Sequence, residues 1–145
     1  MKVTRTVTVD RPAAEVFAYL SDFTTTTEWD PGTVRTTRES GDGGVGTRYH
    51  NVSRFLGRTT ELIYVVTQHH APRRLALRGE NSSVVAHDTL TFEPLGAART
   101  RVTYEADFAF RGWIRLVAPL TAPAFRRLGD RAEEGMRAAL AKPLS

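Results

Sequence analysis

Hydrophobic and polar residues alternate with a period of two near the N-terminus and again, most clearly, over residues 84–110. Close to the N-terminus, Val3, Val7 and Val9 share one parity, to which Arg5 also belongs, and a lysine and threonines occupy the other. This period is typical of a β-strand with one buried face. The strand is predicted to end at the turn-forming residues Asp10-Arg11-Pro12.

The following segment changes to helical spacing. Asp10 is a suitable N-cap and Pro12 suits a first helical turn, so a helix is predicted over about 12–21. Its apolar stripe comprises Val16, Phe17 and Leu20. The threonine-rich segment 23–31 forms at best a short second helix, because Pro31-Gly32 stops it.

Residues 33–110 are rich in threonine, valine, arginine and aromatic residues. Turn residues interrupt them at 41–46, 56–57, 71–72, 80–81 and 94–96. This spacing predicts about six strands joined by hairpins, and hence an antiparallel sheet. The inward parity of the last two strands comprises Val84, Ala86, Asp88, Leu90 and Phe92, and then Val102, Tyr104, Ala106, Phe108 and Phe110.

A closing helix is predicted over about 123–141, after a break. Pro119 and Pro123 each lack a backbone donor, so a short first turn or a kink precedes the uninterrupted part. The apolar stripe comprises Phe125, Leu128, Ala132, Met136, Ala139 and Leu140. This helix is the only sizeable amphipathic element left to cover the apolar sheet face. A curved sheet around one narrow helix can enclose a cavity.

The composition is that of a folded domain of 145 residues, with 41% hydrophobic and 25% charged residues. We expect one domain spanning 1–145. Because cysteine is absent, thiolate zinc sites, thiol catalysis and iron–sulfur clusters are excluded. His69 and His70 are adjacent and would face opposite sides of a strand, so no metal site is predicted. No cofactor is expected.

Positive charge is concentrated near the C-terminus, where residues 111–145 hold seven basic and three acidic residues. A solvated helix face explains such a run better than phosphate binding, so no nucleic-acid partner is expected. The i,i+4 spacing predicts ion pairs between Arg126 and Asp130 and between Glu133 and Arg137.

The N-terminal residues lack the continuous apolar region of a signal peptide. The stretch 116–125 carries no charge, but it is about half as long as a bilayer span. We therefore expect a cytoplasmic protein without stable membrane insertion. The sequence does not indicate an oligomeric state.

Three runs carry a family resemblance: Asp10-Arg11-Pro12-Ala13-Ala14-Glu15-Val16-Phe17, Leu20-Ser21-Asp22 and Glu28-Trp29-Asp30-Pro31-Gly32. Together with the element order, they resemble the START-like SRPBCC superfamily, in particular its polyketide cyclase/dehydrase branch, over essentially the whole chain. The resemblance implies an α+β helix-grip fold. In that fold a seven-stranded curved antiparallel sheet wraps around a long C-terminal helix, with two short helices between strands 1 and 2. No shared catalytic motif comes with it.

Asp88 is the most informative polar residue, because its parity directs it toward the expected cavity. A buried carboxylate without a partner costs several kcal/mol or takes up a proton. Tyr104 lies on the inner face of the neighbouring strand, and the two residues are candidates to hold a ligand carbonyl or to act as acid and base. Alternatively, Asp88 meets solvent near a strand end, or pairs with an arginine such as Arg48.

Ten further residues are predicted to bind a ligand: Trp29, Tyr49, Tyr64, Leu77, Leu90, Ala106, Phe108, Phe125, Leu128 and Ala132. The strands of Tyr49 and Tyr64 alternate poorly, so core packing is the alternative for both. Arg48 and His50 share a parity and are candidates to supply a cation for an acidic ligand, but Tyr49 and Val45 compete with them for the inward face. Trp29 and Trp113 either pack against the sheet or border the cavity entrance.

Three functions are compatible with these features. The first is binding of a hydrophobic small molecule, of lipid, polyketide or isoprenoid type, between the sheet and the closing helix. The second is a polyketide cyclase or aromatase, in which Asp88 and Tyr104 transfer protons during aldol cyclisation and dehydration. The third is a protein- or membrane-interaction module that uses the arginine-rich C-terminal helix.

Overall fold

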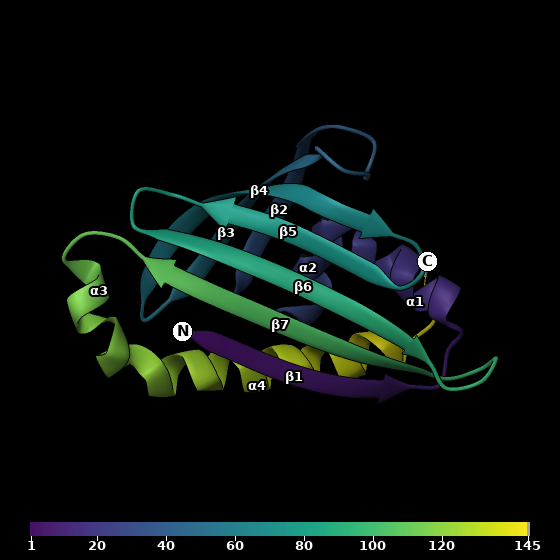
Figure 1. Cartoon of the computed structure of the whole chain (residues 1–145). Coiled ribbons are helices and arrows are strands. Elements are labelled where there is room, and N and C mark those ends of the chain that lie inside the picture. The colour runs from purple at the N-terminus through teal and green to yellow at the C-terminus, as the bar shows by residue number, and fades with distance from the viewer. Residues whose placement is uncertain (145) are drawn as a thin grey trace.

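A curved sheet of seven strands closes around one long helix in the computed structural model, which describes residues 1–144 (Figure 1). The chain begins with β1 (Lys2–Val9), α1 (Ala13–Ser21), the 3-10 turn η1 (Phe23–Thr25) and α2 (Thr26–Trp29). The strands β2 (Thr33–Ser40), β3 (Arg48–Phe55), β4 (Arg58–His70), β5 (Arg74–Glu80), β6 (Val84–Pro94) and β7 (Thr100–Phe110) follow. The chain closes with α3 (Ile114–Val117), the 3-10 turn η2 (Ala118–Thr121) and α4 (Ala122–Leu140).

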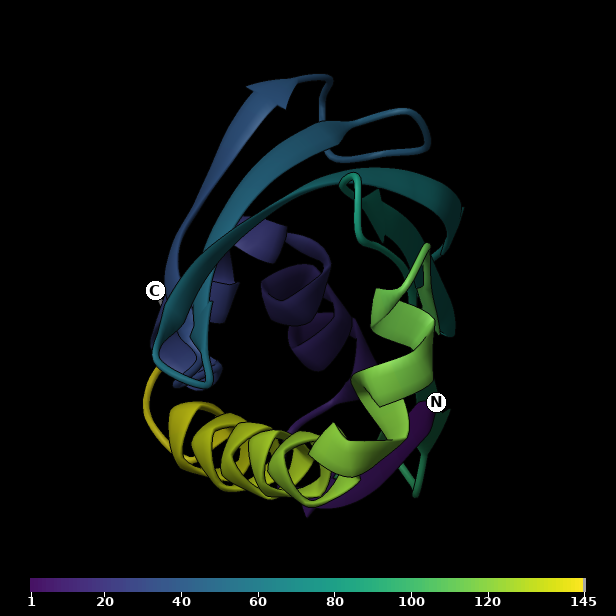
Figure 2. The ribbon, with the colours of Figure 1, turned by 90° about the vertical axis from the view of Figure 1, so that its left-hand side faces the viewer.

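Every neighbouring pair of strands is antiparallel, and the sheet order is β1-β7-β6-β5-β4-β3-β2. The predicted α+β helix-grip fold is thereby confirmed, including its six hairpin-connected strands. Viewed along its length, the sheet curls so far that α4 bridges its two edges (Figure 2). The concave face of the sheet is the apolar one, so other elements must pack inside it to cover it.

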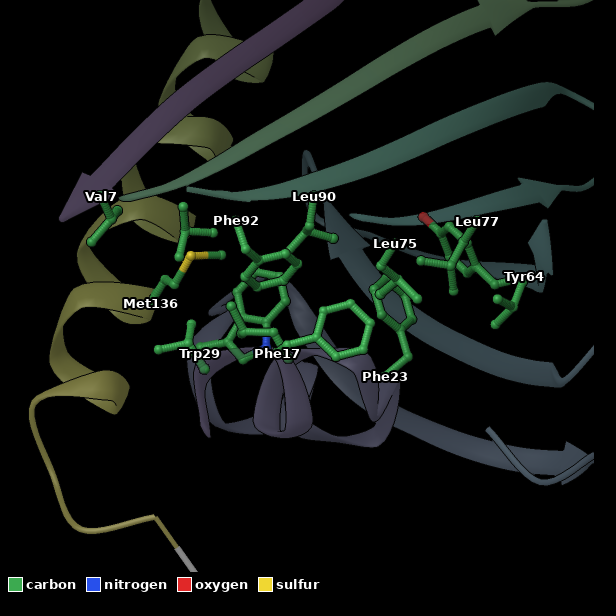
Figure 3. Packing of buried hydrophobic residues seen from close by; sticks show 14 of the residues in the cluster. Val7, Phe17, Phe23, Trp29, Tyr64, Leu75, Leu77, Leu90, Phe92 and Met136 are labelled. Carbon is green, nitrogen blue, oxygen red and sulfur yellow. The ribbon is translucent and has the colours of Figure 1, made fainter. Parts of the chain in front are cut away.

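The short helices after β1 plug the end of the curl away from α3 (Figure 1). Phe17 of α1 is buried and meets the ring of Phe92 edge-on, with the ring centroids 5.1 Å apart. Figure 3 shows how Phe17, Phe23 and Trp29 from these helices meet side chains of the sheet. This packed half is the hydrophobic core.

The start of α1 corrects one detail of the prediction. Pro12, rather than Asp10, occupies the N-cap position, and no side chain caps the helix. Asp10 instead forms an ion pair with Arg99 at 3.2 Å. The proline ring already fixes the backbone angle needed for helix entry, so the helix begins without a polar cap.

The predicted break before the closing helix is confirmed, since α3 and η2 precede α4. The α4 helix lies against β1 and α2. The ion pair between Glu133 and Arg137 is present at 3.6 Å. The predicted partner of Asp130 is wrong: its carboxylate accepts a hydrogen bond from Arg5 of β1 at 3.0 Å, because that strand runs directly beneath the helix.

Candidate functional site

The half of the curl that α1 and α2 do not fill contains a cavity of about 810 Å³. The β3–β4 hairpin, the β5–β6 turn, α3, η2 and the start of α4 all contribute to its lining, so it opens at the end of the molecule that faces the viewer in Figure 2. A volume of this size is within the range of small-molecule sites.

The outer part of the cavity is aromatic. Phe125 of α4 meets Phe55, Phe108 and Phe110, with ring centroids between 4.5 and 5.6 Å apart. Phe108 and Phe110 alternate inward along β7 because side chains of a strand repeat every two residues. Leu128 of α4 extends the same apolar wall.

The opposite wall carries hydroxyl and amide groups. Asn51 is 4% exposed and donates hydrogen bonds to Thr36 at 2.8 Å and to Thr33 at 3.4 Å. Its side-chain oxygen accepts from Ser53 at 2.6 Å. The buried hydroxyls of Thr36 and Thr26 are also bonded to each other, 2.6 Å apart. The network satisfies the buried amide and gives this wall a polar character.

Asp88 and Tyr104 meet at the inner part of the cavity. Counted along the inward face from the mouth of the cavity, Asp88 lies two positions inward on β6 and Tyr104 lies three positions inward on β7. The two strands are adjacent, and their register pairs Leu90 with Tyr104. The Tyr104 hydroxyl donates a hydrogen bond of 2.5 Å to Oδ2 of Asp88. Asp88 is 2% exposed, and its Oδ1 has no hydrogen-bond partner among the described residues. The carboxyl group is thus held from one side only.

This environment changes the acidity of both groups. Burial raises the pKa of Asp88 from 3.8 to about 7, even though the hydrogen bond from Tyr104 acts in the opposite direction. The nearby Asp30 also raises the Asp88 pKa. Burial likewise raises the pKa of Tyr104 far above its ordinary value, so this residue keeps its proton. Near neutral pH the pair contains one exchangeable proton on Asp88 and a fixed donor on Tyr104.

Asp30 is a second carboxyl group on the cavity wall. Its two oxygens accept hydrogen bonds from the backbone of Gly32 and the hydroxyl of Thr33, both at 3.1 Å. Burial raises its pKa, and these two hydrogen bonds oppose the rise. Asp30 was not predicted as a site residue, because it lies in a loop without periodicity, next to a proline that is typical of a turn.

The structure divides the predicted site residues into three groups. Tyr64, Asp88, Tyr104, Phe108, Phe125 and Leu128 line the cavity. Ala106 and Ala132 line only a second, small cavity of about 50 Å³ between β1, β7 and α4. Trp29, Tyr49, Leu77 and Leu90 are buried in the packed core and do not line the large cavity.

The structure decides the three alternatives left open for Tyr49, Asp88 and Trp113. Tyr49 faces inward and is 1% exposed, whereas Arg48 is exposed and His50 pairs with Glu61 at 2.8 Å. Asp88 meets neither solvent nor an arginine, because it is buried and its carboxyl group bonds Tyr104. Trp113 is 72% exposed, so it does not pack against the sheet.

The inward residues on β3 were also missed. Asn51 and Ser53 share the parity of Tyr49, but the alternation along this strand is too irregular to assign its inward face. Thr33 and Ser53 are polar, so the sequence fits an outward, solvent-facing position for them as well as the inward position that they occupy. Within residues 1–144, no group of three or more histidine, cysteine or acidic side chains is placed to hold a metal ion.

A curved antiparallel sheet that grips a C-terminal helix beside an internal cavity defines the class of START-like helix-grip proteins. Within that class, the chain belongs to the family described as polyketide cyclase/dehydrase and lipid transport, whose sequence model matches residues 1–141. No curated protein sequence matches the chain.

Solved structures share this fold at low sequence identity. The Zhui aromatase/cyclase from a Streptomyces species has a TM-score of 0.82 and 18% identity, over 97% of this chain and 93% of that one. A protein of Thermus thermophilus has a TM-score of 0.81 and 14% sequence identity, over 97% of both chains. A START superfamily protein from Mycobacterium smegmatis has a TM-score of 0.73 and 17% sequence identity, over 96% of this chain and 93% of that one. None of the helices within residues 1–144 is long and apolar enough to cross a bilayer.

Proposed function

We propose that this protein binds a hydrophobic small molecule in the cavity between the curved sheet and α4, with Asp88 and Tyr104 as its polar anchor. One observation carries the proposal. A cavity of about 810 Å³ with aromatic walls reaches a buried carboxyl group that has one oxygen unpaired among the described residues. Large apolar pockets with a few convergent polar groups are the usual form of small-molecule sites.

The lining indicates the chemistry of the ligand. An apolar body of lipid, polyketide or isoprenoid type would lie against Phe108, Phe110 and Phe125. A hydroxyl or carbonyl group at its inner end suits Asp88, because a carboxyl group that titrates near neutrality can either accept or donate a hydrogen bond. The family description, which covers both cyclases and lipid transport, is consistent with such a ligand.

Blocking the cavity tests the proposal. Leu128→Trp would fill space at the apolar wall, and Arg127→Trp is the matched control, because Arg127 is exposed and does not line the cavity. With Nile red as a neutral hydrophobic probe, we expect saturable binding by the wild type and by Arg127→Trp, and at least ~10-fold weaker binding by Leu128→Trp. Equal binding by all three proteins would show that the probe does not occupy this cavity.

A cyclase activity in the same cavity is the second candidate, and the Asp88–Tyr104 contact favours it. In an aldol cyclisation, the Asp88 carboxylate would take a proton from the carbon next to a substrate carbonyl. The resulting enolate would form a carbon–carbon bond with a second carbonyl carbon, and the new alkoxide would take the proton back from the Asp88 carboxylic acid. In the dehydration, Asp88 would remove a second proton from the carbon next to the carbonyl and return it to the departing hydroxyl group, which leaves as water. The Tyr104 hydroxyl would stabilise the developing charge on oxygen.

Asp88→Asn separates the two candidates. A cyclase would lose turnover of a poly-β-keto thioester analogue with this substitution while Nile red binding persists, because asparagine cannot accept the proton. A binding protein would show no turnover in the wild type either. Measuring cyclised product by mass spectrometry in both proteins distinguishes these outcomes.

A further inference from the structure

Large hydrophobic side chains project into solvent around the mouth of the cavity. Leu56 at the tip of the β3–β4 hairpin is 62% exposed, and Trp113, Leu116 and Leu120 on the segment around α3 and η2 are 72%, 76% and 82% exposed. Val117, which is 40% exposed, lies between them in the sequence. We call these five residues the rim patch. Leu56 and Val117 also line the cavity, and exposed apolar groups around one opening of a protein are candidates for an interaction surface.

The backbone at Leu56 supports a role for this side chain. Its φ angle is 53°, in the left-handed region, and the next residue, Gly57, has a φ of 77°. Hairpin turns with two such residues usually place asparagine or glycine at the first position. A leucine here costs backbone strain and exposes an apolar side chain, so neither folding nor solubility explains it.

Arginines surround the rim patch. The segment from Gly112 to Gly129 contains Arg115, Arg126 and Arg127 and no acidic residue. The β3–β4 hairpin adds Arg54 and Arg58. All five are exposed, and none forms an ion pair within residues 1–144. Asp30 and Glu61 also line the cavity, but the five arginines leave unpaired positive charge around the rim patch, which is complementary to an anionic surface.

We propose that the rim patch docks the mouth of the cavity reversibly on an anionic lipid bilayer. Tryptophan and leucine side chains would enter the interfacial region while the surrounding arginines contact lipid phosphates, a combination typical of interfacial membrane binding. The opening of the cavity then faces the bilayer, so a poorly water-soluble molecule passes between the two without crossing water.

A protein partner fits the rim patch less well. A stable protein interface covers roughly 20–30 residues on each side, whereas the patch has five apolar residues arranged around an opening. Separate side chains that project from short turns suit a soft, fluid surface better than a rigid one. The same argument applies to a second copy of this chain, whose own rim would bring like charges together.

Flotation with vesicles tests the proposal. We expect binding to phosphatidylcholine vesicles that contain phosphatidylglycerol, and much less to vesicles of phosphatidylcholine alone. The triple variant Trp113→Ser/Leu116→Ser/Leu120→Ser should bind ~10-fold or more weakly, because three large apolar groups are lost. Val45→Ser is the control, because Val45 is 67% exposed but lies in the β2–β3 loop, at the other end of β3 from the hairpin.

Tryptophan fluorescence locates the contact. The chain has two tryptophans, of which Trp29 is 1% exposed and Trp113 is 72% exposed. Docking should shift the emission of Trp113 to shorter wavelength, and brominated phosphatidylcholine in the anionic vesicles should quench it. Trp113→Phe should abolish the quenching and retain most of the binding.

Absence of binding to the anionic vesicles, or equal binding by the triple variant, would overturn the proposal. Capture of an acidic protein by the rim patch without vesicle binding would overturn it as well. The cavity proposal is tested separately, because Trp113, Leu116 and Leu120 do not line the cavity. Nile red binding by the triple variant should therefore equal that of the wild type whatever the vesicles show.

Discussion

At the scale of single residues, Asp88 stands out as a buried carboxyl group in the cavity wall. A carboxyl group that is 2% exposed and bonded through only one oxygen among the described residues prefers its neutral form. Its pKa of about 7 follows from that burial. Because the usual value is 3.8, the folded protein holds a proton on Asp88 over a pH range in which the unfolded chain has released it.

This difference predicts how stability changes with pH. Where the folded state binds more protons than the unfolded state, the free energy of unfolding falls as pH rises. The contribution of Asp88 should therefore fall between about pH 4 and 7 and stay constant above that range. Asp88→Asn should remove it, so the variant should gain roughly 2–4 kcal/mol relative to the wild type between pH 4 and 8.

Urea unfolding at several pH values measures this effect. The comparison between wild type and Asp88→Asn cancels the contributions of ionisable groups that do not interact with Asp88, because both proteins share them. Parallel pH profiles for the two proteins would mean that Asp88 titrates alike in the folded and unfolded states.

Tyr104 should set both the position and the acidity of Asp88. Its hydrogen bond lowers the Asp88 pKa, so Tyr104→Phe should raise that pKa further and cost about 1–2 kcal/mol of stability. Carboxyl carbon chemical shifts give the titration midpoint directly. The matched control is Tyr19→Phe, because that hydroxyl bonds the exposed Glu28 at 2.9 Å and should not affect Asp88. An unchanged midpoint in Tyr104→Phe would contradict the contact.

Sequence alone could place Asp88 and Tyr104 on the same inward face of neighbouring strands, because hydrophobic and polar residues alternate clearly along β6 and β7. It could not place Asn51, because both parities of its strand carry polar as well as apolar residues. Nor could it show that Asp30 turns inward, since the direction of a loop side chain depends on the elements packed around it. Predictions at this scale succeeded where the outward face of a strand is mostly polar.

At the scale of elements, the closing helix is positioned by a glycine. A Cβ atom at Gly135 would lie 1.9 Å from the carbonyl oxygen of Trp29, so α4 approaches the end of α2 more closely than any other residue allows. This contact holds the C-terminal half of α4 against the core. Its other half is left to cover the cavity.

Gly135→Ala tests this packing. Alanine ordinarily favours a helix over glycine by about 1 kcal/mol, so a purely local effect would stabilise the protein. We expect instead a loss of about 2–3 kcal/mol, because the helix must shift away from α2. Thermal unfolding measures the change, with the exposed neighbour Glu134→Ala as a control that should have little effect. A stabilised Gly135→Ala protein would show that the close contact is absent.

The boundaries of helices and strands followed from turn residues and proline positions, which act locally. The N-cap of α1 and the partner of Asp130 did not, because both depend on neighbours distant in sequence. Arg5 lies 125 residues from Asp130, and only the packing of β1 under α4 brings them together. Helix spacing alone therefore predicted the wrong partner.

At the scale of the whole molecule, the fold explains why a cavity exists. Seven strands enclose more volume than α4 can fill, and the short helices after β1 occupy only one end. The sequence indicated a cavity by this comparison, but it could not give the volume or the lining, which depend on the curvature of the sheet. Along β6 and β7, the order of the inward residues puts Phe108 and Phe110 in the outer part and Asp88 and Tyr104 in the inner part.

The central claim is that this cavity binds a hydrophobic small molecule, and one measurement tests it most directly. The wild type and Leu128→Trp would be purified natively without detergent, extracted with organic solvent and analysed by mass spectrometry, beside an unrelated protein of similar charge. We predict one apolar, oxygen-bearing compound at near-stoichiometric amount in the wild type and its loss from Leu128→Trp. The same compound in equal amount from both proteins, or from the unrelated protein, would contradict the claim.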